Sequence, residues 1–200
     1  MITPGNPVTT GLGAATKVFD SALQQRERLR DLAREAEREL MAVQMASMDE
    51  LTLLSNRHGF QALAQLGLDA CQELDKPATL LFFDLDQFKR INELYGRTEG
   101  DDALKTFADV LRIAFRESDV IGRLGSDEFA ALLTGSGAVE ISAIRARLEE
   151  ILDERNGTLH RGYDIRFSIA QLEFDPDIHR SVERLMAALD DICHQGTIEF

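Results

Sequence analysis

The chain has 200 residues, of which 44% are apolar, and its formal net charge is −13. This length can bury one substantial core and leaves room for one long helix, so we expect a single globular domain with a helical extension. The acidic surplus leaves no basic surface for nucleic acid or for anionic lipid. We therefore expect neither nucleic acid nor a membrane as a partner.

The sequence contains no recognisable export or membrane signal. Its longest apolar stretch, 78–83, is far shorter than a bilayer span, and the N-terminus lacks both the basic start and the apolar core of a signal peptide. The two cysteines are too few for a disulfide framework, and the four histidines show no zinc-ligand spacing. These features predict a cytoplasmic protein without a structural metal.

The first 48 residues are predicted to form a loose tail, 1–12, and one long helix, 13–48. The helical segment contains no proline, and mostly apolar residues recur along it at alternating spacings of four and three. Such a heptad seam is typical of a coiled coil, so we expect a homodimer formed through this helix; the alternative is a helix that lies on its own domain. The seam positions are Ala15, Phe19, Ala22, Arg26, Leu29, Ala33, Ala36, Leu40 and Val43.

Residues 49–200 are predicted to form one α+β domain. An amphipathic helix ends at Lys76-Pro77, and the continuous apolar run 78–84 then predicts a strand buried on both faces. The order β-α-α-β-β-α-β-α indicates a mostly antiparallel sheet flanked by helices, related to the split βαβ class. After the first strand we expect helices at 87–96 and 100–119, strands at 119–124 and 128–134, a helix at 138–154, a strand at 163–174 and a helix at 181–193.

Acidic residues stand at three predicted element ends: Asp84 after a strand, Asp101 at a helix start, and Asp127 with Glu128 at a hairpin tip. A lone carboxylate at a strand end usually just meets solvent. Magnesium, however, takes few carboxylates and keeps its other positions for water and substrate phosphates. Two acidic loop ends held side by side by a sheet therefore suit a nucleotide-metal site.

Four motifs follow one another closely along the chain: DELTLLSNR at 49–57, FFDLDQFKRINELYG at 82–96, GDDALKTFADVL at 100–111 and RESDVIGRLGSDEFAALL at 116–133. In order and spacing they resemble the GGDEF domain of diguanylate cyclases, with a variant GSDEF signature. Such domains resemble the catalytic core of class III adenylyl cyclases and join two GTP molecules across a dimer into cyclic di-GMP, with release of two pyrophosphates. The resemblance implies that GTP and cyclic di-GMP are partners of this chain.

By motif position, the resemblance implies that Asp84 and Asp127 hold Mg²⁺ (or Mn²⁺), with help from the Leu85 carbonyl. Glu128 completes the acidic hairpin as a base or as a charge partner. The alternative for Glu128 is an ordinary solvated turn residue. The expected catalytic residues are thus Asp84, Asp127 and Glu128.

The same resemblance assigns residues to the substrate. Backbone N–H groups of Phe88 and Lys89 would meet phosphate oxygens, as at other helix N-termini. Asn92 and Asp101 would bind guanine, because an amide and a carboxylate can pair with its polar edge. The alternatives are a polar helix residue for Asn92 and a helix cap for Asp101. Gly125 and Ser126 of the hairpin are also expected to contact the substrate.

Arg116 and Asp119 match the family's R-x-x-D inhibitory position, which implies a binding site for the product cyclic di-GMP. Arginine can form paired bonds to phosphate or guanine, while the carboxylate accepts from guanine. The alternative is an i,i+3 ion pair at a helix end.

The sequence departs from the family pattern at several positions. Ser126 replaces a glycine, so a positive φ there would cost about 1 kcal/mol or more, and its Cβ would crowd a nucleotide. Arg97 replaces a histidine and Ala170 a glycine. The last residues, DDICHQGTIEF at 190–200, lack the lysine and arginine with which active relatives grip phosphates.

Three functions remain open at this point. The first is a diguanylate cyclase of weak or conditional activity, favoured by the retained acidic residues. The second is a non-catalytic receptor for cyclic di-GMP or GTP, favoured by Ser126 and the missing terminal cations. The third is a coiled-coil interaction protein that uses the domain as a scaffold, favoured by the heptad seam.

Overall fold

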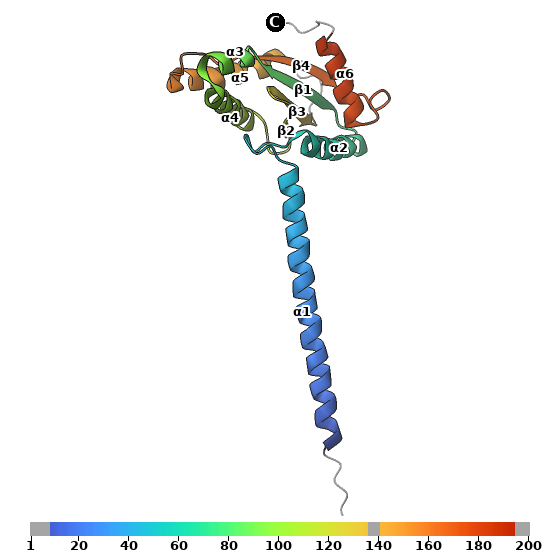
Figure 1. Cartoon of the computed structure of the whole chain (residues 1–200). Helices are drawn as coiled ribbons and strands as arrows, with labels where there is room; N and C mark the ends of the chain where they lie inside the picture. Colours follow the sequence, from blue (N-terminus) through green and yellow to red (C-terminus); the bar gives the residue numbers. More distant parts are fainter. Residues whose placement is uncertain (1–8, 136–140, 195–200) are drawn as a thin grey trace, which may run out of the picture. The chain divides into compact units, whose positions relative to one another are not determined.

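The computed structural model describes residues 9–135 and 141–194, and the chain divides into two units, Met1–Ala46 and Ser47–Phe200 (Figure 1). The first unit is the helix α1 (Thr9–Ala46). It begins four residues before the predicted start at 13, because residues 9–12 contain no proline that would stop it. It ends two residues before 48, and residues 1–8 of the predicted tail lie outside the described residues.

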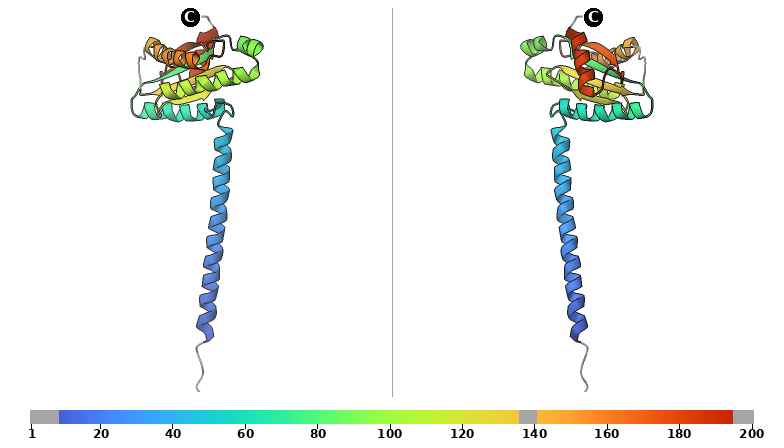
Figure 2. Two further views of the ribbon diagram at one scale, coloured as in Figure 1. Left: turned by 90° about the vertical axis from the view of Figure 1, so that its left-hand side faces the viewer. Right: turned by 90° about the vertical axis from the view of Figure 1, so that its right-hand side faces the viewer.

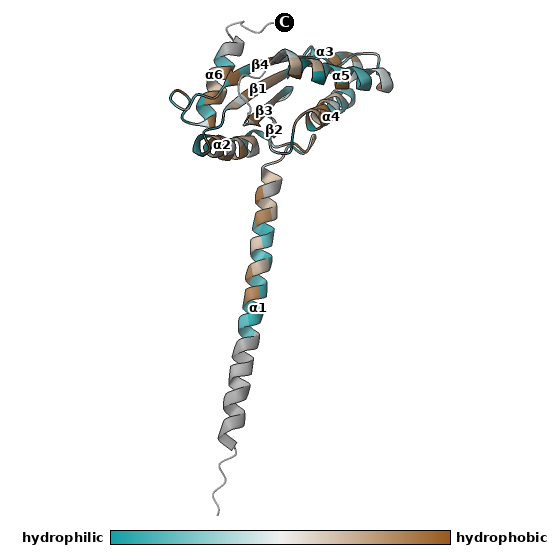
Figure 3. Cartoon of the chain, turned by 180° about the vertical axis from the view of Figure 1, so that it is seen from behind, coloured by the Kyte–Doolittle hydropathy of each residue, from teal (hydrophilic) through white to brown (hydrophobic). Residues whose placement is uncertain are grey.

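Helix α1 carries its apolar residues on an unburied seam. Leu29, Leu40 and Val43 are 67%, 60% and 63% exposed, since a single helix cannot cover its own side chains. Brown and teal residues alternate along the described part of this helix in Figure 3. The side chains of three predicted seam positions, Ala15, Phe19 and Ala22, lie outside the described part of the chain.

The second unit is the predicted α+β domain with an antiparallel sheet of strand order β2-β3-β1-β4. Two split βαβ units interleave in it: β1 connects to β2 through two helices, and β3 connects to β4 through one. The predicted element order is therefore confirmed. Its elements are α2 (Arg57–Glu73), β1 (Ala78–Leu85), α3 (Phe88–Tyr95), α4 (Arg97–Ala114), β2 (Val120–Arg123), β3 (Glu128–Thr134), α5 (Ile141–Leu159), β4 (Phe167–Glu173) and α6 (Val182–His194).

Helices cover both faces of the sheet, as the two side views in Figure 2 show. Because successive side chains of a strand point to opposite faces, β1 sends Leu81 and Phe83 into a core with α4 and α5, and Leu80 and Phe82 into a second core with α2 and α6. Residues 78–83 are all buried, which confirms the predicted two-sided strand. The sheet thereby fixes the end of β1, where the acidic residues begin.

Strand β4 starts at Phe167 rather than at the predicted residue 163. Side-chain hydrogen bonds hold the preceding segment against α3 and α4 instead of the sheet. The Tyr163 hydroxyl donates to the Glu99 carbonyl over 3.0 Å, and the Tyr95 hydroxyl donates to the Gly162 carbonyl over 2.8 Å. Helix α5 runs to Leu159, beyond the predicted end at 154, whereas its predicted first residues, 138–140, lie outside the described residues.

No helix in the described ranges combines the length and the apolar content that crossing a bilayer requires.

Candidate functional site

The predicted acidic residues meet at one end of the sheet. Asp84 is the second-last residue of β1, and its Cα partner across the antiparallel pair is Glu128, the first residue of β3. Asp127 precedes Glu128 in the β2–β3 hairpin, and its carbonyl accepts a hydrogen bond of 3.1 Å from the Leu85 N–H. The fold thus brings together carboxylates more than forty residues apart in the sequence.

The crowding of carboxylates changes the acidity of Asp84. Burial raises the pKa of its carboxyl to about 6, and the negative charges of Asp127, Glu128 and Asp86 act in the same direction. A cation beside Asp84 would relieve this repulsion. The crowded carboxylates around Asp84 therefore favour a bound divalent metal ion.

Two of these carboxylates and the neighbouring Leu85 carbonyl are a donor set of the kind that Mg²⁺ or Mn²⁺ accepts, provided that substrate phosphates and water complete the shell. Among the residues that the structure describes, no group of three or more His, Cys, Asp or Glu side chains is arranged as a metal cage. The site thus resembles one that binds a metal together with a nucleotide.

Ser126 does not have the strained backbone that a positive φ would impose. Within the described residues, positive φ occurs at other positions, including Gln87 and Gly96, but not at residue 126. The Ser126 hydroxyl instead donates a short hydrogen bond to the Asp127 carboxylate. The substitution therefore changes the surroundings of the candidate metal ligand without straining the turn.

Gly125 lies close beneath the side chain of Glu128 as that side chain is placed here. A Cβ at this position would collide with the carboxylate of Glu128. Glu128 also lies 3.5 Å from the guanidinium of Arg57, with both side chains about half exposed. The absence of a Cβ at residue 125 thus lets the Glu128 side chain fold back over the hairpin.

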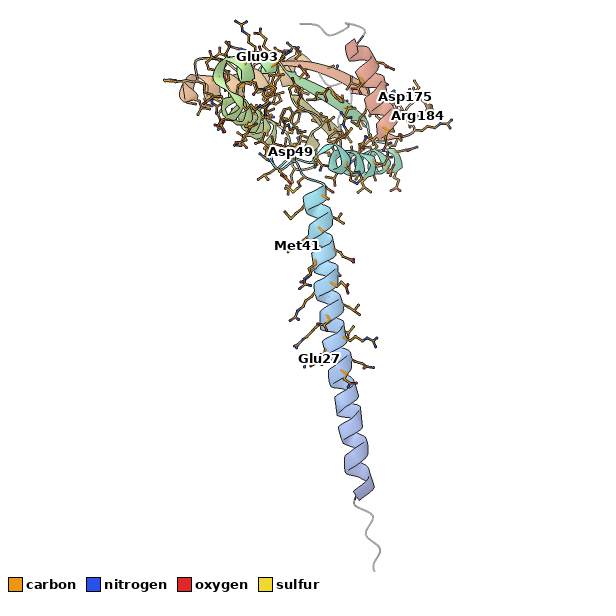
Figure 4. The ribbon with its side chains drawn as sticks, viewed as in Figure 1. Glu27, Met41, Asp49, Glu93, Asp175 and Arg184 are labelled. Carbon is orange, nitrogen blue, oxygen red and sulfur yellow. The ribbon has the colours of Figure 1, made fainter. Side chains whose placement is uncertain are left out.

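Two arginines support the hairpin. Both stand in the sequence motifs, but no role was predicted for them from the sequence. Arg123 Nη1 donates to both carboxylate oxygens of Asp49, over 3.1 and 3.2 Å, and Nη2 donates to the Ser126 carbonyl over 2.7 Å. Arg57 donates from Nε to the Leu124 carbonyl over 3.1 Å. The segment that leads into the domain, where Figure 4 labels Asp49, is therefore bonded directly to the GSDEF turn.

The predicted guanine-binding residues lie at the corner between α3 and α4. Gly96, with φ of 90°, makes the sharp turn that joins these helices. A Cβ on Gly100 would collide with the side-chain oxygen of Asn92, so the Asn92 amide lies directly against α4. Asp101 is the next residue of α4 and is exposed. The corner thus carries a partly exposed amide, which lies against Gly100, and an exposed carboxylate one residue further along α4.

Phe88 and Lys89 are the first two residues of α3. The N-cap residue, Gln87, is in the left-handed region with φ of 55° and its side chain makes no capping hydrogen bond. The first-turn N–H groups therefore have no N-cap side chain as acceptor. The Phe88 ring is buried, whereas the Lys89 ammonium group is exposed and lies 3.9 Å from the Glu93 carboxylate.

Arg116 and Asp119 border a cavity of about 290 Å³, which Arg147 of α5 also lines. The expected alternative, an ion pair between these two residues, does not form: the Asp119 carboxylate accepts from the Arg116 backbone N–H over 3.0 Å. The Arg116 guanidinium makes no hydrogen bond or ion pair with any described residue. Sequence reasoning missed Arg147, because nothing local connects residue 147 with residue 116.

Comparison with known proteins agrees with this geometry. The family described as "Diguanylate cyclase, GGDEF domain" matches residues 46–196. A probable diguanylate cyclase, DgcC of Escherichia coli, is 32% identical over 144 residues, which are 72% of this chain and 39% of that protein. Diguanylate cyclase DgcP of the same organism is 32% identical over 82% of this chain and 48% of its own length. The chain thus spans less than half of the curated relatives it matches.

Solved structures share the fold. A sensory box/GGDEF family protein from Caulobacter crescentus superposes with a TM-score of 0.63 and 27% identity, over 76% of this chain and 97% of that one. The coiled coil and GGDEF domain of DgcB from the same organism, in complex with c-di-GMP, covers 92% of this chain with a TM-score of 0.61 and 26% identity, and is itself covered over 95% of its length. The matched family, the sheet topology and the motif positions agree, and the chain belongs to the GGDEF domain family of diguanylate cyclases.

Proposed function

We propose that this domain is a diguanylate cyclase, which binds GTP with a divalent cation, Mg²⁺ or Mn²⁺, and condenses two GTP molecules into cyclic di-GMP and two pyrophosphates. The observation that carries the proposal is the acidic group at the end of β1. Asp84 faces Glu128 across the strand pair and is crowded by Asp127, so that its pKa is raised to about 6. Such mutual repulsion destabilises the empty site and favours a bound cation.

The residues divide the work of the reaction. Asp84 and Asp127 would hold the metal ion, which when bound neutralises the triphosphate and favours deprotonation of the attacking 3′-hydroxyl. Glu128 would accept that proton or balance the charge, held in place by Arg57 at 3.5 Å. Asn92 and Asp101 would hold the guanine at the α3–α4 corner, and the first N–H groups of α3 would meet phosphate oxygens.

A two-protomer arrangement follows from this chemistry, because each product molecule joins two GTP molecules. We propose a homodimer formed through α1, whose seam residues Leu29, Leu40 and Val43 are exposed. A related structure that contains a coiled coil and a GGDEF domain superposes on 92% of this chain, which supports the same arrangement here.

The experiment that tests the cyclase is incubation of the protein with GTP and Mg²⁺, with the product identified by mass-resolved chromatography. Asp127→Ala should abolish formation of cyclic di-GMP, because one of two metal-binding carboxylates is lost. Asp109→Ala, an exposed carboxylate on α4 paired only with Arg112, should leave turnover unchanged. Absence of product from the unmodified protein, with either cation, would contradict the proposal.

A second candidate, a receptor for cyclic di-GMP, is favoured by the cavity that α4, the segment after it, β3 and α5 line. Two guanidinium groups, Arg116 and Arg147, and the carboxylate of Asp119 border it. This set can bond phosphate oxygens and a guanine edge. Calorimetry should show binding of cyclic di-GMP that Arg116→Ala weakens by about tenfold or more. Binding without any turnover of GTP would identify a receptor instead of an enzyme.

A further inference from the structure

The corner between α3 and α4 carries an arginine that the proposed site does not yet use. Arg97 is the first residue of α4 and is exposed. Its guanidinium makes no ion pair and no side-chain hydrogen bond with any part of the chain that the structure describes. A long cationic side chain therefore stands free directly after the Gly96 turn.

The position of Arg97 on the helix places it beside the two proposed guanine-binding residues. Residues four apart on a helix lie one above the other on the same face, so Arg97 and Asp101 share one side of α4. Gly100 belongs to the same side and lies against the Asn92 amide. The three side chains of Asn92, Arg97 and Asp101 thus border one exposed corner.

Without Arg97, this corner has too few hydrogen-bond donors for the acceptor atoms of guanine. An ionised carboxylate only accepts, so Asp101 can pair with the N1–H and N2 amino groups of the base. The O6 and N7 atoms of guanine are acceptors and require donors. The Asn92 amide supplies one donor group, whereas the guanidinium of arginine presents two parallel N–H groups that match O6 and N7 together.

We infer that Arg97 is a guanine-binding residue, which donates to N7 and O6 while Asp101 accepts from the opposite edge of the same base. The inference rests on the proposed function, because it places guanine at the α3–α4 corner. It also accounts for selection against adenine, which presents an amino donor where guanine presents O6. That donor would face the donors of Arg97.

Binding of two nucleotides that differ only at N7 tests this inference. The probes are 2′,3′-dideoxy-GTP and its 7-deaza analogue, measured by calorimetry with Mg²⁺; neither has the attacking 3′-hydroxyl, so no turnover interferes. The unmodified protein should bind the 7-deaza nucleotide at least about fivefold more weakly. Arg97→Ala should bind both nucleotides with the same weakened affinity.

Two further variants separate base recognition from general charge. Arg90→Ala removes an equal charge from α3, where the guanidinium donates a hydrogen bond to the Gln87 side chain, and should keep the discrimination at N7. Arg97→Lys keeps the charge but not the paired N–H groups, and it should lose most of the discrimination at N7. Discrimination that persists in Arg97→Ala, or equal weakening of both nucleotides without any discrimination in the unmodified protein, overturns the inference alone. Failure of the unmodified protein to bind either probe overturns the guanine site itself.

Discussion

Ser126 shows how one side chain can change the surroundings of a carboxylate without straining the backbone that carries it. The hydroxyl donates to the Asp127 carboxylate, and the backbone at residue 126 avoids the positive φ that would have strained a serine. An oxygen of Asp127 that accepts this hydrogen bond is less available to a cation. The serine would thus weaken Asp127 in the metal-binding role that we propose for it.

We predict that Ser126→Gly raises kcat/KM for cyclic di-GMP formation by about threefold to tenfold, the equivalent of one net hydrogen bond. Steady-state kinetics at several Mg²⁺ concentrations would measure this change. Ser126→Ala is the matched control, since it removes the hydroxyl but keeps the Cβ. A gain in both variants assigns the effect to the hydrogen bond, and a gain in the glycine variant alone assigns it to crowding by the Cβ. Equal activity in all three proteins contradicts both explanations.

Asp84 illustrates how partial burial beside other carboxylates reduces stability. Since its pKa is raised to about 6 in the folded protein, from an ordinary value of 3.8, the folded state binds more protons than the unfolded state between these two values. The free energy of unfolding contributed by this group therefore falls as the pH rises from about 4 to about 6.

The corresponding prediction is that Asp84→Asn stabilises the metal-free protein. At pH 7.5 the gain should be about 1 kcal/mol, because solvent screening of a partly exposed group reduces the full value. At pH 3.5 the gain should nearly vanish, since Asp84 is then protonated in the folded state and mostly protonated in the unfolded state. Urea unfolding with a chelator present measures it, and Asp69→Asn, on the exposed side of α2, controls for loss of surface charge. A gain that is independent of pH would exclude carboxylate repulsion as its cause.

At the scale of elements, the segment leading from α1 into the domain and the β2–β3 hairpin form one bonded unit. The Arg123 side chain, only 13% exposed, connects the Asp49 carboxylate with the Ser126 carbonyl. Burial raises the pKa of Asp49, but hydrogen bonds from Thr52 and from Arg123 outweigh burial and hold this pKa below its ordinary value. This carboxylate therefore stabilises the fold above pH 4 and loses that contribution as the pH falls through its lowered pKa.

We predict that Arg123→Lys lowers the free energy of unfolding by about 2 kcal/mol, because an ammonium group cannot bond Asp49 and Ser126 at once. It should also lower kcat by about tenfold with little change in KM, since the hairpin that carries Asp127 loses its support while the guanine corner does not. Unfolding and kinetic measurements on the same protein test this pair of effects.

Arg90→Lys, on the exposed side of α3, is the control for exchanging an arginine. A double-mutant cycle between Asp49→Asn and Arg123→Lys should give a coupling free energy of about 1 kcal/mol or more at pH 7, and less at pH 3. Independent effects of the two substitutions would show that the bridge contributes nothing.

At the scale of the whole molecule, the proposed homodimer would assemble through the seam of α1. We predict that Leu40→Glu, which places a charge in this seam, converts a dimer into a monomer and reduces product formation at equal protein concentration. Ala42→Glu introduces the same charge on the same helix away from the seam and should leave the dimer intact. Sedimentation equilibrium over a range of concentrations measures the association. A dimer that withstands Leu40→Glu would place the interface elsewhere.

Local patterns in the sequence were sufficient for the order of the elements and for the buried strand β1. The apolar run 78–83 predicts a buried strand because both faces of a central strand need apolar side chains, whichever helices pack on them. The same reasoning failed at 163–166, where hydrogen bonds to α3 and α4 outweigh strand propensity. The motif positions of Asp84, Asp127 and Asn92 could likewise be located from the sequence, since spacing along the chain identifies them.

Only the tertiary structure decided which side chains support these motifs. Asp49 and Arg123 are separated by 74 residues, and Arg116 and Arg147 line one cavity from separate parts of the chain, so no local periodicity could pair them. The backbone conformation of Ser126 could not be predicted from local sequence either. It depends on hydrogen bonds from Arg123 to the Ser126 carbonyl and from Leu85 to the Asp127 carbonyl. Sequence alone determined the fold and the identity of the acidic residues, whereas long-range packing determined their spacing, their support and their acidity.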